Sequence, residues 1–520
     1  MSISLLDWLI ALAPIVTILG LMVLWRWSGA HAGAVGWLVA LVGATIRFGA
    51  GPQLIVYSQV RAFLLSLFVL YIVWSALLLY HVGREAGAIE AISAGVARMT
   101  ADRLLQLLLL AWVFASFLQG VTGFGVPTAV VAPLLIGLGF QPELAVVATT
   151  IGHSWAVTFG SVGSSFYTLL AVTGQPATAL ARPTALLLGI SWLTNGFLVA
   201  YLYGRWRAII RGSGMILVLG ATMAGVQYLV ATAGAWQISA FIGGFAGLLV
   251  AAFLTRWRRP DHATAAGSRV ESTPKMSFGV ALSAYLVMML VVLAATFISP
   301  LDRILNSVQL NVTFPAVSTS RGWLVAPGPG RAVSVFGHAG ALLVYSSVAA
   351  ATIYARAGYY RPRAVVRIVT ATLRDSVGST LGILAMVGMA LIMDNSGMIS
   401  ILAQGLATAF GSSLPLISPI VGALGAFMTG SNTNSNVLFG ALQQELAALL
   451  GYSAPIILAA QTAGAAMGSN ISPTKLIVGA STAGLAGDEG IVLRLAIGYG
   501  AILVAVVSLA TVCLIYLSAP

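Results

Sequence analysis

Six consecutive polar residues, at positions 431–436, interrupt an otherwise apolar part of the chain. Apolar residues lead into this run from 419 to 427 and follow it from 437 to 440. Unsatisfied polar groups in hydrocarbon cost several kcal/mol each, so non-helical backbone survives at that depth only where it lines a cavity. The run therefore predicts a break between two half-helices and one half of a small-molecule binding site.

The composition predicts a membrane protein. Of the 520 residues, 59% are hydrophobic and only 7% are charged, whereas soluble domains carry about 25% charged residues. A span needs about 20 apolar residues, and the chain supplies enough for roughly 12 to 14 transmembrane or re-entrant helices. The predicted fold class is all-α, with one integral membrane domain over 1–520. The first apolar stretch, 4–24, lacks a cleavage-like site, so we expect a retained span.

The net charge of +12 does not indicate a nucleic-acid partner. The basic residues gather in short loops, at 205–211, 256–275 and 356–374, where they act as topology signals for the cytoplasmic side. The chain has no nucleotide-binding glycine loop and no Walker lysine, so we expect no cofactor. Energy coupling must then come from an ion gradient, which favours a secondary carrier over an ATP-driven pump.

Apolar runs between the loops predict the individual spans. They are expected at about 5–25, 34–48, 63–80, 215–229, 238–254, 278–298, 333–354 and 491–517. The charged connector 84–103 alternates apolar and polar residues, which predicts a surface helix. Counting crossings between basic loops places 299–331 outside the cell.

Two regions, 104–174 and 415–490, do not have the pattern of simple spans and resemble each other. The segment 117–120 (Phe-Leu-Gln-Gly) matches 427–430 (Phe-Met-Thr-Gly), and the later glycines at 139 and 152 match those at 451 and 464. A chance match is the alternative, because glycine and alanine are common in membrane helices. We interpret the regions as two repeats whose broken helices meet at a midplane site.

The first break, at 119–127, combines polar side chains with glycines. Gly123 and Gly125 let the backbone approach a ligand closely. A helix that starts after them directs backbone N–H groups at the break, which favours an anion. Gln119 and Thr122 favour a binding site over the alternative, a small-residue packing motif between helices.

The second break offers six hydroxyl or amide side chains to a ligand. The candidate ligands are Ser431, Asn432, Thr433, Asn434, Ser435 and Asn436. Their side chains donate and accept hydrogen bonds, and freed backbone carbonyls can coordinate a cation. Polar contacts between helices are the alternative, but six such residues in a row exceed what that role needs.

Further candidates lie near the breaks. Ser154 and Ser472 can donate hydrogen bonds to a substrate, and so can Asn395. Lys475 can bind a carboxylate as a buried cation or can extend to the membrane interface.

Two groups are candidates for carrying a proton. His153 lies inside an apolar core region, where it is either a proton relay or a hydrogen-bonded structural residue. Asp394 ends an apolar run and is either functional or located at a membrane edge.

At these residues the chain resembles the L-lactate permease family, bacterial and archaeal symporters of lactate or glycolate with protons. The resemblance rests on 117–139, 156–160, 395–398, 430–439, 471–473 and 484–487, with Glu489 and Arg494. It implies a membrane location, monocarboxylate transport and an all-helical carrier with two related halves. We expect a multi-pass secondary transporter of lactate, glycolate or a similar 2-hydroxy monocarboxylate in a prokaryotic cytoplasmic membrane, working by alternating access. The expected partners are a small organic anion, a proton or sodium ion, and the lipid bilayer. The wider ion-transporter superfamily adds a scaffold domain, a moving domain and often a homodimer.

Three positions depart from the family pattern. Gln119 replaces a usual glutamate, Asn432 a usual aspartate, and Ser469 a usual lysine. A neutral amide cannot carry a proton, so His153 or Asp394 would have to do so.

Two other functions stay open. A sodium-coupled carrier of dicarboxylates or sulfonates would fit the Ser-Asn-Thr run at 431–433. An intramembrane enzyme would need a nucleophile–base pair or a metal cluster at fixed spacing. No such motif appears, so we expect neither an enzyme nor a metal site.

Overall fold

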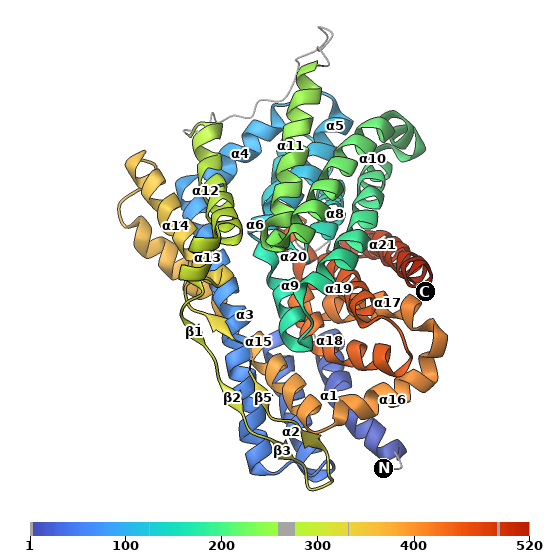
Figure 1. Ribbon diagram of the computed structural model, residues 1–520. Helices are drawn as coiled ribbons and strands as arrows, with labels where there is room; N and C mark the ends of the chain where they lie inside the picture. The colour runs from blue at the N-terminus through green and yellow to red at the C-terminus, as the bar shows by residue number, and fades with distance from the viewer. Residues whose placement is uncertain are drawn as a thin grey trace.

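The structure is a computed structural model that describes residues 4–25, 27–123, 125–257, 276–330, 332–485 and 489–518. These residues are mostly helical (Figure 1). The first helices are α1 (Leu5–Val23), α2 (Gly29–Ile46), α3 (Pro52–Ala86), α4 (Ala88–Ala97), α5 (Arg103–Leu107), α6 (Ala115–Val121), α7 (Val126–Gly137), α8 (Pro142–Gly152), α9 (Gly160–Thr173), α10 (Ala177–Val230) and α11 (Ser239–Trp257). The later helices are α12 (Phe278–Phe297), α13 (Ser299–Leu305), α14 (Ala339–Arg356), α15 (Ala364–Asn395), α16 (Met398–Phe410), α17 (Leu414–Thr429), α18 (Asn432–Leu449), α19 (Ala454–Asn470), α20 (Pro473–Thr482) and α21 (Glu489–Leu517). Residues 258–275 of the basic cluster and residues 486 and 487 of the motif 484–487 lie outside the described residues.

The all-α polytopic fold is confirmed. Nine described helical segments are long and apolar enough to cross a membrane, or ten if the bent pair α8 and α9 forms one span. One of the nine, 177–255, folds back where Gly204 and Arg205 leave the helical region, so it contains more than one crossing. This folding back accounts for part of the difference from the predicted 12 to 14.

Helix α3 is longer than the predicted span 63–80. Its first turns contain Ser58 and Gln59, which a lipid-facing span would exclude. The Ser58 hydroxyl donates to the carbonyl of Leu54 over 2.7 Å, and Gln59 accepts from the Trp37 indole over 3.0 Å. Because these polar groups find partners inside the protein, the helix continues through them.

The connector helix α4 exists, but the prediction that it lies on the surface is wrong. Its apolar residues and Ser93 are buried, and the helix packs against α3 and α12. The alternation in its sequence arises mainly from alanines and glycine, which fit between helices as well as at a surface.

The segment 299–331 forms α13 and then five of the six short strands of an antiparallel ribbon. Three pairs build the ribbon: β1 (Gln309–Leu310) with β6 (Val333–Ser334), β2 (Thr313–Phe314) with β5 (Gly328–Pro329), and β3 (Val317–Ser318) with β4 (Leu324–Val325). The ribbon follows α3 (Figure 1), where the Phe314 ring meets the Tyr57 ring at 5.2 Å. The predicted span 333–354 begins instead at Ala339, because Val333 and Ser334 pair with β1.

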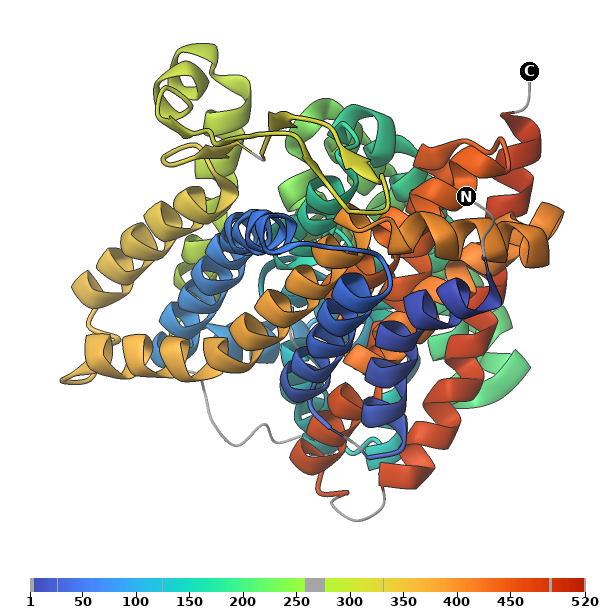
Figure 2. The same ribbon diagram turned by 90° about the horizontal axis from the view of Figure 1, so that it is seen from below.

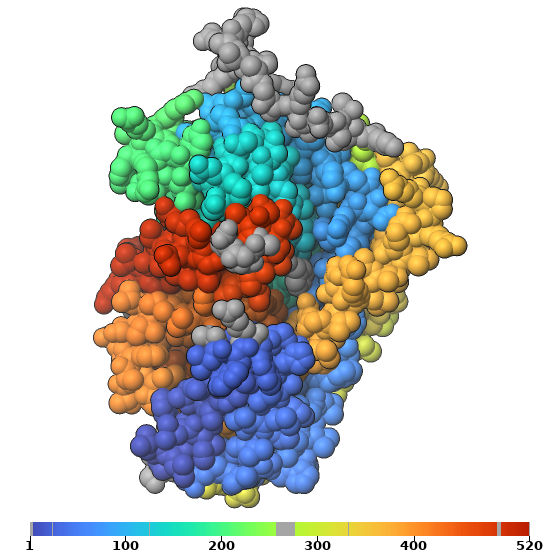
Figure 3. Space-filling model, turned by 180° about the vertical axis from the view of Figure 1, so that it is seen from behind, coloured from blue at the N-terminus to red at the C-terminus, as the bar shows by residue number. Residues whose placement is uncertain are grey.

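The buried apolar residues form two clusters. One cluster joins α1, α2, most of α3, α15 and α16, and we call these helices the scaffold group. Helix α18 also packs against this cluster. The other lies mainly in α4 to α12, α19 and α21. Seen from below, α14 and α15 project to one side (Figure 2). From behind, the C-terminal helices in red lie between the N-terminal helices in blue and the teal segment (Figure 3).

We call helices α6–α9 and α17–α20 together the turn group. Its two halves have the same order of elements. Each half has two helices joined by a tight turn, followed by two helices joined by a break. The matched glycines do not coincide, since Gly120 lies inside α6 whereas Gly430 forms a turn. The shared order supports two related repeats at 104–174 and 415–490, which remain a proposal.

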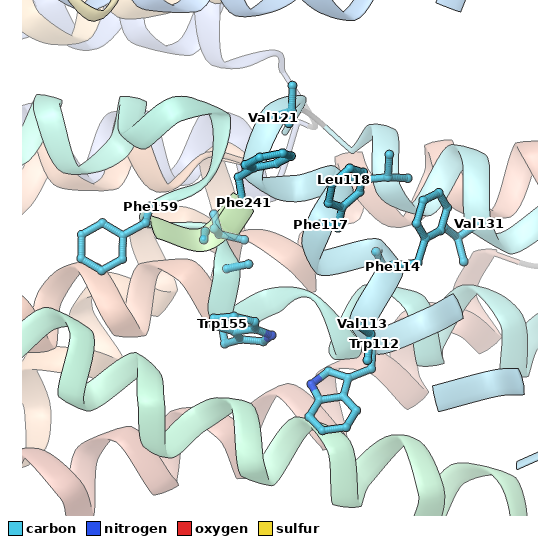
Figure 4. Packing of buried hydrophobic residues seen from close by; sticks show 14 of the residues in the cluster. Trp112, Val113, Phe114, Phe117, Leu118, Val121, Val131, Trp155, Phe159 and Phe241 are labelled. Carbon is cyan, nitrogen blue, oxygen red and sulfur yellow. The ribbon is translucent and has the colours of Figure 1, made fainter. Parts of the chain in front are cut away.

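Small residues bring the helices of the turn group together. A Cβ on Gly464 or Gly468 would collide with backbone carbonyls of Pro419 and Ala423 on α17. On α6, a Cβ at Gly120 would lie 2.5 Å from the Cα of Phe241. Figure 4 shows the aromatic core beside this contact, with Phe117 and Phe241 close together; their ring centroids are 5.0 Å apart. Such backbone contacts fix the turns firmly relative to the core.

Candidate functional site

The first turn joins α6 to α7. Thr122 ends α6, and its hydroxyl donates to the carbonyl of Leu118 over 2.8 Å. Gly123 (φ +59°) and Gly125 (φ +85°) adopt left-handed backbone that a β-carbon disfavours. A Cβ on Gly123 would also collide with the Ser161 hydroxyl. The predicted break is therefore present, and its glycines permit a close approach to α9.

The first broken helix consists of α8 and α9, bent by 52°. Ser161 and Val162, at the start of α9, have φ of +48° and +54°. Non-glycine residues in this conformation cost on the order of 1–2 kcal/mol each, so the surrounding packing must impose it. Asn195 fixes the opposite side of the break, because its amide donates to the Ser154 hydroxyl over 2.9 Å.

His153 lies at the end of α8 and is 1% exposed. Its Nδ1 is 2.6 Å from the carbonyl oxygen of Thr149. A carbonyl only accepts hydrogen bonds, so Nδ1 carries the hydrogen in the neutral ring and Nε2 is the basic nitrogen.

The second turn is shorter than predicted. Only Gly430 (φ +69°) and Ser431 leave the helical region between α17 and α18. The Ser431 hydroxyl accepts from the backbone N–H of Asn434 over 3.3 Å and caps α18. The prediction of a non-helical run across 431–436 is wrong, because most of its side chains find partners on neighbouring helices and do not need an open loop.

Asn432 and Asn436 tie the first turns of α18 to two other helices. The Asn432 amide donates to the Thr158 hydroxyl over 3.0 Å, and its oxygen accepts from Thr462 over 3.2 Å. The Asn436 amide donates to the Thr462 hydroxyl over 2.9 Å and to the Ser165 carbonyl over 3.0 Å. The second turn and the α8–α9 break are therefore parts of one polar network.

Two more residues of the run also contact neighbours. The hydroxyls of Thr433 and Ser165 are 3.0 Å apart. The Ser435 hydroxyl donates to the carbonyl of Gly422 over 2.7 Å.

The two turns meet at the start of α20. A Cβ on Gly125 would lie 3.8 Å from Cγ of Lys475, and a Cβ on Gly430 would collide with the Thr474 hydroxyl. Ser472 directly precedes α20, and its hydroxyl donates to the carbonyl of Ser469 over 2.8 Å. Both predicted breaks therefore contact the same four-residue segment, 472–475.

Lys475 supplies the positive charge of this site. Its Nζ donates to the Ser469 hydroxyl over 3.2 Å and to the Asn470 side-chain oxygen over 3.0 Å. Among the described residues, no carboxylate lies within ion-pair distance of it. Two neutral acceptors do not balance an ammonium charge, so the arrangement can bind an anion.

Asp394 and Asn395 are not brought to the turns. The Asn395 amide donates to the Ser58 hydroxyl over 3.0 Å, within the scaffold group. Asn434 does face the scaffold group, since its Nδ2 and the methyl of Met386 both lie within 4 Å of a Cβ built on Gly29. A helix rises about 1.5 Å per residue, so Asn395 lies roughly 13 Å along α15 from Met386, the residue near Asn434.

The site includes residues that the sequence did not single out. These are Thr158, Ser161, Ser165, Thr462, Asn470 and Thr474. All but Ser165 lie within or beside stretches that the glycine and polar patterns already marked. Isolated threonines and serines in apolar helices give no stronger signal, because most of them bond to their own backbone.

A hollow of about 500 Å³ lies elsewhere, between α2, α3 and α15. Its lining is mostly alanine, leucine and aromatic side chains. We place the site at the turns, because polar groups and an unbalanced charge converge there. The described residues contain no cluster of three or more metal-ligating side chains.

The comparisons with known proteins identify the family of the chain. The model of the L-lactate permease family matches residues 7–518. The chain belongs to this family. It is 28% identical to the L-lactate permease of Bacillus subtilis (strain 168), over 98% of this chain and 95% of that protein. It is 27% identical to the glycolate permease GlcA of Escherichia coli (strain K12), over 97% and 94%.

Among solved structures, the YdaH transporter of Alcanivorax borkumensis is 16% identical, with a TM-score of 0.48 over 86% of this chain and 85% of that one. Family membership confirms the resemblance found in the sequence. This permease is a multi-pass protein of the cytoplasmic membrane and a transporter by family. The family match includes both turns and the segment 472–475.

Proposed function

We propose that this permease is a secondary active transporter of a small 2-hydroxy monocarboxylate, lactate or glycolate, with proton symport. The observation that carries the proposal is the convergence of both turns on the segment 472–475, which contains Lys475, a cation whose charge no described carboxylate balances. Relatives named for lactate and glycolate give the substrate class.

The carboxylate binds at Lys475 and at the ends of helices in this proposal. Helices α7, α18 and α20 all begin beside the two turns. The N-terminus of a helix offers free N–H groups and favours an anion by roughly 0.3–1 kcal/mol. Together with the ammonium group, three such ends are enough for the weak binding that a carrier needs, on the order of −4 to −8 kcal/mol.

The proton is carried by His153. Its basic Nε2 can accept a proton, whereas Gln119 and Asn432 cannot. The strongly bonded Nδ1 keeps the ring in one orientation, as a proton relay requires. Asp394 is the weaker candidate, because it lies on α15 next to Asn395 and away from the turns.

Alternating access requires the turn group to move relative to the scaffold group. The network through Asn432, Thr158 and Thr462 holds the turn group together as one unit. Contacts between the groups run mainly through α18 against α15 and α16 and through α9 against α3. These two surfaces are where sliding would occur.

The test is uptake of radiolabelled L-lactate into proteoliposomes. An imposed pH gradient, acidic on the side of the label, should drive accumulation in the wild type, and a sodium gradient alone should not. No uptake and no exchange of any 2-hydroxy monocarboxylate under either gradient would refute the proposal.

A further inference from the structure

Gln119 is a buried glutamine whose amide makes no hydrogen bond to any described residue. Its side chain is 2% exposed, and its Oε1 is fully buried and without a partner. Most buried polar side chains in native proteins are paired. An unpaired amide costs stability, so this one requires an explanation.

The amide lies between the first turn and the start of α9. Its Nε2 is 3.5 Å from a Cβ built on Gly123 and 2.8 Å from one built on Gly160. A Cβ on Gly123 would meet the Ser161 hydroxyl as well. Because positions 123 and 160 are both glycine, the Gln119 amide can pack directly against the backbone at these two positions.

Lys475 approaches the same turn two residues further on. A Cβ on Gly125 would lie 3.8 Å from Cγ of Lys475. Two residues of chain span at most about 7 Å, so the amide and the lysine side chain flank one short piece of backbone. Both side chains therefore adjoin the backbone of the first turn, so a ligand that binds at this turn can contact the two.

We propose that Gln119 binds the 2-hydroxyl group of the substrate and so selects 2-hydroxy acids over plain carboxylic acids. This inference rests on the proposed function, since it assumes a carboxylate at Lys475. The hydroxyl is on the carbon next to the carboxylate, and it donates to the unpaired Oε1. An amide also offers a donor, so rotation of the group by half a turn still provides a hydrogen bond.

Propionate has the shape of lactate without the hydroxyl. When propionate binds, Oε1 of Gln119 stays without a hydrogen bond, so propionate gains no binding free energy from this group. A site with a buried polar group placed for a substrate hydroxyl discriminates strongly against an analogue that lacks it. For one neutral hydrogen bond we expect lactate to bind about 10-fold more tightly than propionate.

The experiment compares affinities for L-lactate and propionate in purified full-length protein. Gln119→Met keeps the length of the side chain and removes its hydrogen bonds. The ratio of the two dissociation constants should fall to near one in Gln119→Met. An unchanged ratio in this variant overturns the inference.

Gln227→Met is the matched control. Gln227 is also fully buried, and neither of its amide atoms has a partner among the described residues, but it lies on α10. Its substitution should leave the ratio as in the wild type. An equal loss of selectivity in Gln227→Met would show that selectivity is lost through general destabilisation of the core. That result would overturn the assignment to Gln119.

A second arm needs no variant. In the wild type, L-lactate should bind more tightly than propionate, because propionate has no group on its second carbon that can bond to the Gln119 amide. Equal affinities for the two acids overturn the inference even if Gln119→Met does not fold. If none of the acids binds, the proposed function itself fails, which is a different result from binding without selectivity.

Discussion

The Asn432 amide donates a hydrogen bond to the Thr158 hydroxyl over 3.0 Å. These residues are far apart in the sequence, and they join the second turn to the α8–α9 break. Thr158 also donates to the Thr462 carbonyl over 3.1 Å, so α19 is part of the same connection. The site is therefore built by contacts between the two halves of the turn group, and neither half contains it alone.

This connection predicts coupled effects of two substitutions. Asn432→Ala and Thr158→Val should each lower the unfolding free energy by about 1–3 kcal/mol, because each leaves a buried partner unpaired. The double variant should lose less than the sum, by about 1 kcal/mol. Thermal unfolding in detergent measures all three, and strict additivity would show that the bond contributes nothing.

Removal of the charge at Lys475 should abolish most substrate binding. In Lys475→Gln the amide can still donate to Asn470, but no cation faces the carboxylate. We expect the affinity for L-lactate to fall at least about 10-fold, as for loss of a charge-assisted hydrogen bond. Arg182→Gln, which removes an exposed arginine on α10, is the control and should bind normally. Normal binding by Lys475→Gln would move the anion site elsewhere.

Replacement by alanine should affect stability differently at two glycines that have similar backbone torsion angles. Gly430 has φ +69° and a Cβ there would collide with Thr474, whereas Gly451 has φ +73° and open space around it. Gly451→Ala should cost about 1–2 kcal/mol from backbone strain alone. Gly430→Ala should cost more and should also weaken lactate binding, since the turn must move away from α20. Equal losses of stability and unchanged binding in both would argue against this contact.

Substitution of His153 should separate transport from proton coupling. His153→Gln keeps a donor for the Thr149 carbonyl but has no basic nitrogen. Accumulation driven by a pH gradient should be lost, while exchange of internal for external lactate should continue. His31→Gln, at an exposed histidine, should behave as the wild type. Undiminished accumulation in His153→Gln would assign the proton to another group, with Asp394 tested next.

Several features followed from the sequence before any tertiary contact was known. The scarcity of charge determined a polytopic helical protein, because few soluble folds could bury so much apolar surface. Glycines at 123, 125 and 430 marked the two turns, since left-handed backbone excludes most other residues. The polar residues around them marked the site, because lipid would not tolerate them.

Only the tertiary structure decided how these parts meet. The six polar residues from 431 are mostly helical, since Thr158 in the α8–α9 break, Ser165 on α9 and Thr462 on α19 supply partners that no local pattern reveals. Asn395 bonds to Ser58 in the scaffold group instead of joining the site. The meeting of both turns at the segment 472–475 depends on long-range packing of glycines against backbone. Sequence shows which groups must avoid lipid, but the choice among their many polar partners is made by helix packing in space.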